Sequence, residues 1–387
     1  MKAAVLTSPS PIEQGPLHLE DVASPEPEPG EIVVQVRACG VCRSNLHMIE
    51  GDWVAAGVPA RTPIVPGHEV VGTVAAVGDG VNWLHAGERA GVQPLWSTCG
   101  QCEYCLSGRE QLCQLKQITG ETVDGGYAEQ MLAKATHTYV IPDSLDNAAA
   151  AVLFCPGITA YGAVAKARLS PAKSVAVFGV GGVGHVALQF AKLTGAETLA
   201  VTRSAQRLEL SEELGASRTI DASRGNAGKA LRASGGVDAT LVFAPSNDVV
   251  RQAIDATKPG GVVVIGVNAE IGPFPFADEK TVVGSLLGSR QMMREVLRIA
   301  GEGRVRVVQE AYPLDQAEEA LARSSAARYA AGLYSCPDDL CARSSADVER
   351  PAALEDASVA SAVPHRASRR PTPLGISVAL QPDLEPT

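Results

Sequence analysis

Four cysteines lie close together in one short stretch of the chain. Cys99, Cys102 and Cys105 are separated by spacers of two residues, and Cys113 follows after a short loop. Zinc binds four thiolates tetrahedrally at about 2.3 Å, and this spacing lets the sulfur atoms face one point. A chance cluster of buried or reactive thiols is the alternative. We interpret the motif as a structural zinc site, which has no open coordination position and stabilises a loop.

Three other residues have side chains suited to an open metal site. Cys42 lies in the segment 39–47, His68 lies in the segment 66–69, and Cys155 precedes a glycine-rich turn. Singly, each is a weak signal, because a lone cysteine is usually a small core residue. Two thiolates and one imidazole would leave zinc a fourth position for substrate or water, which defines a catalytic site.

A glycine-rich turn follows an apolar segment at 175–178. Gly179, Gly181 and Gly184 form the pattern Gly-x-Gly-x-x-Gly before an amphipathic segment. Such glycines permit a tight turn and close approach of a dinucleotide pyrophosphate, which the helix N-terminus then faces. Gly-rich turns are common, but the strand before and the helix after are both predicted here. The pattern therefore favours dinucleotide binding.

The end of the next strand indicates which dinucleotide is bound. An Asp or Glu about 20 residues after the glycines normally binds the ribose of NAD. Here the strand ends in Thr202 and Arg203, and Arg207 follows one helical turn later. A neutral residue followed by arginine suits a 2′-phosphate, which predicts NADP over NAD. The alternative is that Arg203 is a surface residue at the start of a helix.

The elements around these residues change in kind along the chain. Alternating β-rich segments at 31–38 and 70–78 indicate an all-β unit up to about residue 150. A helical segment at 148–166 is interrupted at 155–157. Beyond it, continuous apolar strands alternate with helices, which indicates a doubly wound parallel sheet and an α/β fold. The strands are expected at 174–178, 198–202, 239–243 and 262–265, and the helices at 188–193, 206–214, 292–300 and 314–323.

The segment 336–387 is rich in proline and lacks aromatic residues. Such a composition buries too little apolar surface to offset the entropy of ordering it, so we expect disorder. Its Cys336 and Cys341 are interpreted as free thiols.

Composition excludes several classes of function. A net charge of −10 over 387 residues disfavours binding to nucleic acid or anionic membranes. We find no signal peptide and no apolar run of membrane-spanning length. The expected location is the cytoplasm, where thiols stay reduced. The nine cysteines therefore need an explanation other than disulfides.

Taken together, the motifs resemble the zinc-dependent medium-chain alcohol dehydrogenase family over about residues 1–335. The resemblance rests on segments 39–47, 67–74 and 155–161, the four-cysteine motif and the glycine turn. It implies a GroES-like catalytic domain at 1–153 that holds both zinc sites and a Rossmann domain at 154–285. It also implies a return to the first domain at 286–335, followed by the tail at 336–387.

The resemblance implies roles for individual residues near the metal. Cys42, His68 and Cys155 match the catalytic zinc ligands, and Glu69 matches a carboxylate beside the metal. Ser44 and His47 match a proton relay. Cys39 is not a ligand in this scheme.

A further set matches cofactor contacts. Arg43 corresponds to a pyrophosphate contact, and Arg290 is a second candidate. The implied cofactor-binding residues are Arg43, Thr159, Gly179, Gly181, Gly182, Val183, Gly184, Thr202, Arg203, Arg207, Gly266, Val267 and Arg290.

Three features depart from the family pattern. Asn45 stands where the family usually has Asp, a partner of the zinc-bound histidine, so zinc affinity should be lower. Pro94 occupies a pocket position often held by an aromatic residue. The tail after 335 does not resemble the family's ending, which usually contains a final strand.

The implied activity is reversible alcohol oxidation with NAD or NADP and two zinc ions per chain, in a homodimer or homotetramer. Trp53 and Trp96 are candidate walls of the substrate pocket, or else core residues. Alternatives are a reductase of cinnamyl-type aldehydes or polyols, and a non-catalytic zinc protein that senses the cofactor. The presence of Cys42, Ser44 and His68 disfavours the last.

Overall fold

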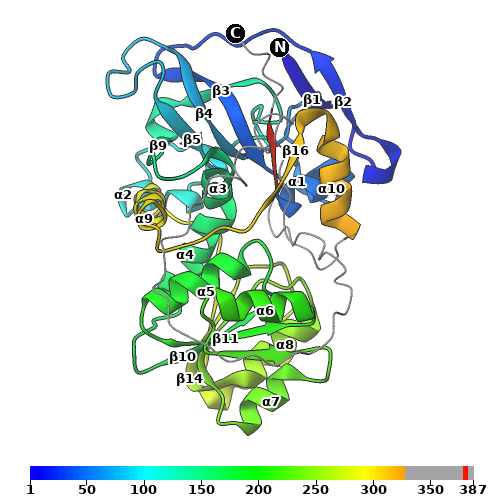
Figure 1. The fold of residues 1–387 in the computed structure, drawn as a ribbon, viewed down its shortest axis with the longest axis vertical. Coiled ribbons are helices and arrows are strands. Elements are labelled where there is room, and N and C mark those ends of the chain that lie inside the picture. The colour runs from blue at the N-terminus through cyan, green and yellow to red at the C-terminus, as the bar shows by residue number, and fades with distance from the viewer. Residues whose placement is uncertain (327–377, 382–387) are drawn as a thin grey trace, which may run out of the picture.

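The computed structural model describes residues 1–326 and 378–381. It has two domains, one built on an antiparallel sheet and one on a parallel sheet flanked by helices (Figure 1). The α/β fold class expected from the sequence is confirmed.

The first domain contains a seven-stranded sheet in the order β16-β17-β3-β4-β5-β9, with β8 paired to β3. Two small antiparallel pairs, β1–β2 and β6–β7, lie outside this sheet. The strand expected at 31–38 lies within β3. The strand expected at 70–78 coincides with β4 except at its last residue. Its N-terminal strands are β1 (Lys2–Leu6), β2 (Leu17–Asp21), β3 (Glu31–Gly40), β4 (Glu69–Val77), β5 (Arg89–Val92), β6 (Leu95–Ser97), β7 (Gln117–Ile118), β8 (Gln130–Lys134) and β9 (Thr138–Val140).

Two short helices in this domain begin directly after a cysteine. Helix α1 (Arg43–Glu50) has Cys42 at its N-cap, and helix α2 (Glu103–Leu106) has Cys102 at its N-cap. The start of a helix therefore fixes the backbone direction at one cysteine in each of the two predicted metal sites.

The second domain is a six-stranded parallel sheet in the order β12-β11-β10-β13-β14-β15. The strand order reverses between β10 and β13, which is where dinucleotides bind in doubly wound folds. All four expected strands are present. The strands are β10 (Ser174–Phe178), β11 (Glu197–Thr202), β12 (Arg218–Asp221), β13 (Val237–Val242), β14 (Thr257–Ile265) and β15 (Thr281–Gly284), and the helices are α5 (Gly184–Leu193), α6 (Ala205–Glu213), α7 (Ala227–Ala233) and α8 (Asn247–Ala256).

A continuous helical segment joins the two domains. Helix α3 (Asn147–Val152) leads into a π-helical turn (Leu153–Gly157) and then into α4 (Ile158–Lys166). Pro156 lies inside the turn and has no N–H to donate, so the regular hydrogen-bond ladder cannot continue there. The interruption expected from the sequence is thus a π turn, a form frequent at functional sites.

This helical segment is longer and more apolar than was expected from the sequence, in which no run of membrane-spanning length was found. The 20 residues Asn147–Lys166 pass a length and composition test for a membrane span. They are mostly buried inside the protein, as the core helix of a folded domain would be.

After the parallel sheet the chain returns to the first domain. Helix α9 (Arg290–Gly301) covers the helix predicted at 292–300, and β16 (Glu310–Pro313) joins the seven-stranded sheet. The helix predicted at 314–323 begins as a 3-10 turn (Leu314–Gln316) and continues as α10 (Ala317–Ala326). Figure 1 shows α9 and α10 beside the upper, antiparallel domain.

The expectation of disorder throughout 336–387 was wrong at one point. Residues Val378–Gln381 form β17, which pairs parallel to β16 and antiparallel to β3. Leu380 is buried. The proline-rich composition of the whole segment concealed a short apolar run. The backbone N–H and C=O groups of β16 and β3 supply the hydrogen-bond partners of this run. The rest of that segment, including Cys336 and Cys341, lies outside the described residues.

Leu380→Ala tests the contribution of β17. The side chain is 1% exposed, so its truncation should reduce the free energy of unfolding by about 2–4 kcal/mol. Thermal or urea unfolding measures this change. Leu19→Ala on β2, 47% exposed, is the control and should change stability little. Equal stability of Leu380→Ala and wild type would contradict the placement of β17.

Candidate active site and cysteine-rich lobe

Four residues predicted near the catalytic metal converge in the structure. The potential ligand atoms of Cys42, His68, Glu69 and Cys155 all lie within 4.8 Å of one another. Cys42 precedes α1, His68 directly precedes β4, Glu69 is the first residue of β4, and Cys155 lies in the π turn. Three segments distant in sequence therefore build one cluster, and the turn between the domains supplies one of its thiols.

The two thiols of this cluster have the separation that a tetrahedral zinc site requires. The sulfur atoms of Cys42 and Cys155 are 3.8 Å apart. Tetrahedral ligands at about 2.3 Å from zinc place sulfur atoms ~3.8 Å apart. The Cys155 thiol hydrogen bonds to the Cys42 sulfur, which lowers the pKa of Cys42 well below its usual value and raises that of Cys155. Cys42 is therefore the thiolate of the pair, and a cation bound between the two sulfur atoms would favour loss of the Cys155 proton as well.

Glu69 adds a buried carboxylate to the cluster. Burial raises the pKa of Glu69 well above its usual value. Its Oε1 atom is buried and has no hydrogen-bond partner among the described residues. An unpaired buried carboxylate oxygen is costly, and a bound cation would compensate it. This observation, together with the two thiols and the imidazole, fits a zinc ion.

The imidazole of His68 turns one nitrogen toward the cluster and the other away from it. Its Nε2 lies 3.5 Å from Ser44 Oγ, which in turn donates a hydrogen bond to Cys42 Sγ at 3.1 Å. Its Nδ1 lies 3.3 Å from the side-chain amide nitrogen of Asn45 and 3.8 Å from Glu121 Oε1. Nε2 is therefore the nitrogen available to a metal.

His47 lies apart from this cluster, on the same helix as Ser44. Its Nδ1 is 2.6 Å from Asp52 Oδ2, and Arg43 Nε donates to its Nε2 at 3.4 Å. The His47 ring is 5.6 Å from the Trp53 ring, centroid to centroid. The side chain is about one-third exposed, so it can exchange protons with solvent.

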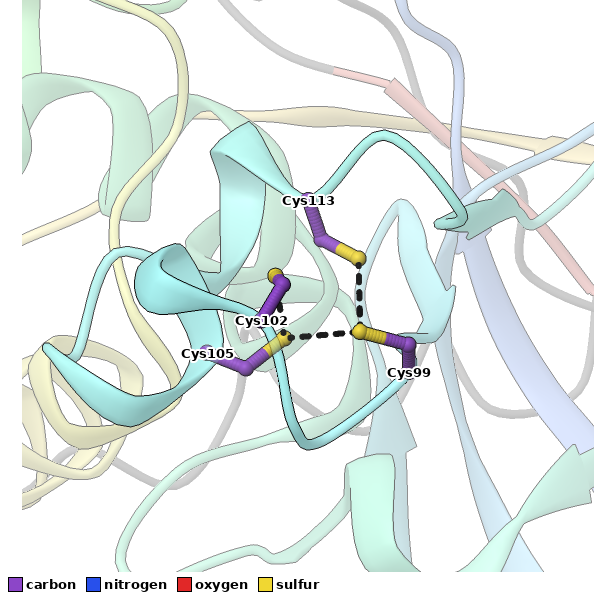
Figure 2. A group of neighbouring side chains, drawn as sticks. All are labelled: Cys99, Cys102, Cys105 and Cys113. Carbon is purple, nitrogen blue, oxygen red and sulfur yellow. Dashed lines mark hydrogen bonds between the residues drawn. The ribbon is translucent and has the colours of Figure 1, made fainter.

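The four-cysteine lobe forms a second, separate cluster (Figure 2). Sulfur–sulfur distances are 3.8 Å for Cys99–Cys105, 3.5 Å for Cys102–Cys105 and 3.6 Å for Cys113–Cys99. These values again match ~3.8 Å for tetrahedral thiolates around zinc. Backbone N–H groups of Gln101 and Cys102 lower the pKa of Cys99 to about 6, which favours the thiolate.

Cys39 lies outside both clusters. Its side chain is fully buried in the hydrophobic core, and burial raises its thiol pKa well above the usual value. This placement agrees with its omission from the expected ligands.

The glycine turn has the geometry expected of a dinucleotide site. Gly179 follows β10 with φ +97°, and a Cβ there would lie 2.8 Å from the backbone nitrogen of Ala244. Helix α5 begins at Gly184, and no side chain in the described part of the chain caps its start. The N–H of His185 donates to the carbonyl of Gly181, which leaves the N–H groups of Gly182 and Val183, in the turn itself, to bind phosphate. Gly181, Gly182 and Val183 lie in the turn, and Gly266 and Val267 follow β14.

The residues expected at the adenosine ribose follow β11. Thr202 is buried at the strand end, Arg203 is exposed, and Arg207 is partly buried on α6. Burial lowers the pKa of Arg207 to about 10. Within the described residues, the Arg207 guanidinium has no hydrogen-bond or ion-pair partner in the protein.

The structure places two candidate site residues, Trp96 and Arg290, away from the positions expected from the sequence. Trp96 is buried in the main hydrophobic core, and its indole N–H donates to the carbonyl of Leu132; it is a core residue, as the alternative interpretation allowed. Arg290 pairs with Glu110 in the cysteine-rich lobe at 3.2 Å and donates to the carbonyl of Thr136, so its contact with a pyrophosphate has no support in this arrangement.

Sequence reasoning missed two acidic residues. Asp52 contacts His47, and Glu121 approaches His68 from a loop far along the chain. Asp52 follows His47 by five residues, just past the end of α1, and could have been recognised from that spacing. Glu121 had no local signal, because only the folded loop brings it to His68.

Comparisons with known proteins agree with this fold. The family description "Alcohol dehydrogenase GroES-like domain" matches residues 28–143, and "Zinc-binding dehydrogenase" matches residues 182–302. An alcohol dehydrogenase from Geobacillus stearothermophilus is 39% identical over 331 residues, covering 84% of this chain and 96% of that protein.

Two solved structures illustrate the cofactors found among similar proteins. A zinc-binding dehydrogenase from Sinorhizobium meliloti, bound to NADP, has a TM-score of 0.77 at 27% identity and covers 98% of this chain and 99% of that one. Acetophenone reductase from Geotrichum candidum, in complex with NAD, has a TM-score of 0.74 at 27% identity and covers 84% of this chain and 94% of that one.

The GroES-like domain, the Rossmann domain and the cysteine clusters define a zinc-binding dehydrogenase. More narrowly, the chain belongs to the zinc-dependent medium-chain alcohol dehydrogenase family. It is a zinc-dependent alcohol oxidoreductase, and use of a nicotinamide dinucleotide is consistent with this family.

Single serine substitutions separate the two clusters. Cys102→Ser should remove one zinc ion and lower the melting temperature, because it breaks a closed site. Cys42→Ser should remove the other zinc ion and abolish alcohol oxidation while the fold remains. Metal analysis, thermal unfolding and activity assays measure these effects. If Cys42→Ser unfolded the protein and Cys102→Ser only inactivated it, the assignments would be exchanged.

Proposed function

We propose that the chain oxidises neutral alcohols reversibly at a zinc ion held by Cys42, His68 and Cys155. The convergence of their ligand atoms within 4.8 Å, together with Glu69, carries this proposal. Two thiolates offset the charge of a divalent zinc, so the site suits an uncharged alcohol, aldehyde or ketone. When bound, zinc would polarise the substrate oxygen as a Lewis acid, and the nicotinamide would take up the hydride.

The protein's own side chains would handle the proton. Ser44 Oγ lies 3.1 Å from Cys42 Sγ and 3.5 Å from His68 Nε2, so its hydroxyl sits where a substrate oxygen would approach. His47 lies three residues further along α1 and contacts solvent. Asp52 accepts a hydrogen bond from Nδ1 of His47 and thereby orients the ring. This arrangement supports Ser44 as the inner and His47 as the outer end of a proton path.

His47→Ala tests the proton path. We expect alcohol oxidation at neutral pH to fall by about a hundredfold, with partial recovery as the pH and the concentration of bulk base rise. The zinc content should stay that of wild type. His18→Ala on β2, whose side chain is exposed, is the matched control. Loss of zinc, or an unchanged pH–rate profile, would refute this role.

For the cofactor, we propose NADP in preference to NAD. No acid ends β11, since Thr202 stands there, and a carboxylate would repel a 2′-phosphate. The partly buried Arg207 guanidinium lacks an anionic partner within the described residues. A buried cation without a partner is costly, and a phosphate bound beside it would supply one.

Thr202→Asp and Arg207→Gln test the cofactor preference. A charge-assisted contact is worth about 1.5–3 kcal/mol, which corresponds to roughly ten- to a hundredfold in kcat/KM. We expect each variant to lose that factor with NADPH and to change little with NADH. Arg251→Gln on α8 is the control. A wild type that prefers NADH would show that this strand end has been misinterpreted.

We further propose that both metal clusters hold zinc, giving two ions per chain, and that the protein works in the cytoplasm as a homo-oligomer. All seven cysteines among the described residues are unpaired, which suits a reducing compartment. Strand β15 lies at the edge of its sheet, and Phe276 and Leu286 nearby are 85% and 56% exposed. An open strand edge beside exposed apolar side chains favours association with a second copy.

A further inference from the structure

We propose that Glu121 is a positioning residue for His68 and supplies the carboxylate that Asn45 lacks. The proposal rests on the proposed catalytic zinc site. The observation that supports the proposal is that Glu121 Oε1 lies 3.8 Å from His68 Nδ1, the nitrogen that faces away from the metal cluster.

The chemistry of His68 requires an acceptor at Nδ1. Nε2 is the nitrogen near Ser44 and Cys42, so it must keep its lone pair for a metal. In a neutral imidazole the proton then resides on Nδ1 and must be donated to a neighbour. A carboxylate at this position fixes the tautomer and raises the basicity of the ligating nitrogen.

Asn45 alone meets this requirement poorly. Its side chain is fully buried, and its amide nitrogen lies 3.3 Å from His68 Nδ1. Its amide oxygen accepts a hydrogen bond from the hydroxyl of Tyr127 at 3.5 Å. An amide offers both donor and acceptor and carries no charge, so it neither enforces the Nδ1 proton nor balances a dication.

Glu121 has the properties that Asn45 lacks. An ionised carboxylate is negative and has no proton to donate, so its charge favours the Nδ1-protonated tautomer. The side chain is 15% exposed, which strengthens its interaction with charge at the cluster. Among the described residues, His68 is the sole partner of this carboxylate. At 3.8 Å the carboxylate lies beyond direct hydrogen-bond distance, so it acts on the Nδ1 proton of the neutral imidazole through its charge.

The loop that carries Glu121 is built to lie against His68. The preceding residue, Gly120, has φ +72°, and a Cβ there would lie 2.7 Å from the backbone nitrogen of Gly67. Only glycine permits this approach to the residue next to His68. The backbone of Glu121 is held on both sides, since its N–H donates to Ile118 and its carbonyl accepts from Ala60. The position of Glu121 is therefore fixed by backbone contacts and does not depend on its own charge.

Zinc retention tests this proposal independently of activity. Wild type, Glu121→Gln, Asn45→Asp and the double variant are titrated with a zinc chelator, and the zinc remaining on the protein is measured. Glu121→Gln should weaken the more loosely held zinc by about ten- to a hundredfold, with the other zinc unchanged. Glu20→Gln on the exposed strand β2 is the charge-matched control and should retain both ions.

Rescue distinguishes positioning from a merely structural effect. Asn45→Asp should restore retention in the Glu121→Gln background, because it returns a carboxylate to Nδ1. The visible spectrum of the Co²⁺-loaded protein should change with Glu121→Gln and revert in the double variant. Unchanged zinc retention in Glu121→Gln, or failure of Asn45→Asp to restore it, would overturn the proposal. If Cys42→Ser retained both zinc ions, the proposed catalytic site itself would be wrong.

Discussion

The arrangement of this protein depends on two partly buried thiols held 3.8 Å apart, Cys42 and Cys155. Two thiolates at this distance repel each other strongly in a medium of low dielectric constant, and a divalent cation between them removes that repulsion. Cys42 belongs to the antiparallel domain, whereas Cys155 lies in the π turn that leads into the parallel domain. A metal at this point would therefore link the two domains as well as bind substrate.

Helix α4 connects the metal cluster to the glycine turn. Cys155 lies just before α4, and α4 packs against α5, the helix whose N-terminus faces the expected pyrophosphate. Tyr161 of α4 meets Phe190 of α5 edge-to-face, with ring centroids 5.1 Å apart. Aromatic pairs of this geometry favour one relative orientation. The packing of these two helices thus fixes the position of Cys155 relative to the glycine turn.

Residue types and spacing predicted the parts of the site that are local in sequence. The four-cysteine lobe was evident from local spacing, and the glycine turn from the strand and helix on either side of it. The triad of Cys42, His68 and Cys155 came from resemblance, because its members are far apart in sequence and meet only through the fold. Four of the six parallel strands were predictable because each contains a continuous apolar run, whereas β12 and β15 were not predicted.

Features that depend on long-range contacts were missed or misplaced. Strand β17 is too short to stand out in its polar surroundings, and its pairing with β16 and β3 is set by the sheet. Trp96 was a candidate for the substrate pocket, but its indole N–H found a partner in Leu132 within the core. Glu121 carried no local signal, since only the backbone approach of Gly120 to Gly67 brings it to His68.

X-ray absorption at the zinc edge of the purified protein tests the central claim most directly. A lobe with four sulfur ligands and a catalytic site with two sulfur ligands give an average of roughly three sulfur atoms per zinc at about 2.3 Å, with one nitrogen or oxygen at about 2.0–2.1 Å. The account predicts this mixed shell. A shell of four sulfur atoms without nitrogen or oxygen would show that only the lobe binds zinc and would contradict a zinc ion at Cys42, His68 and Cys155.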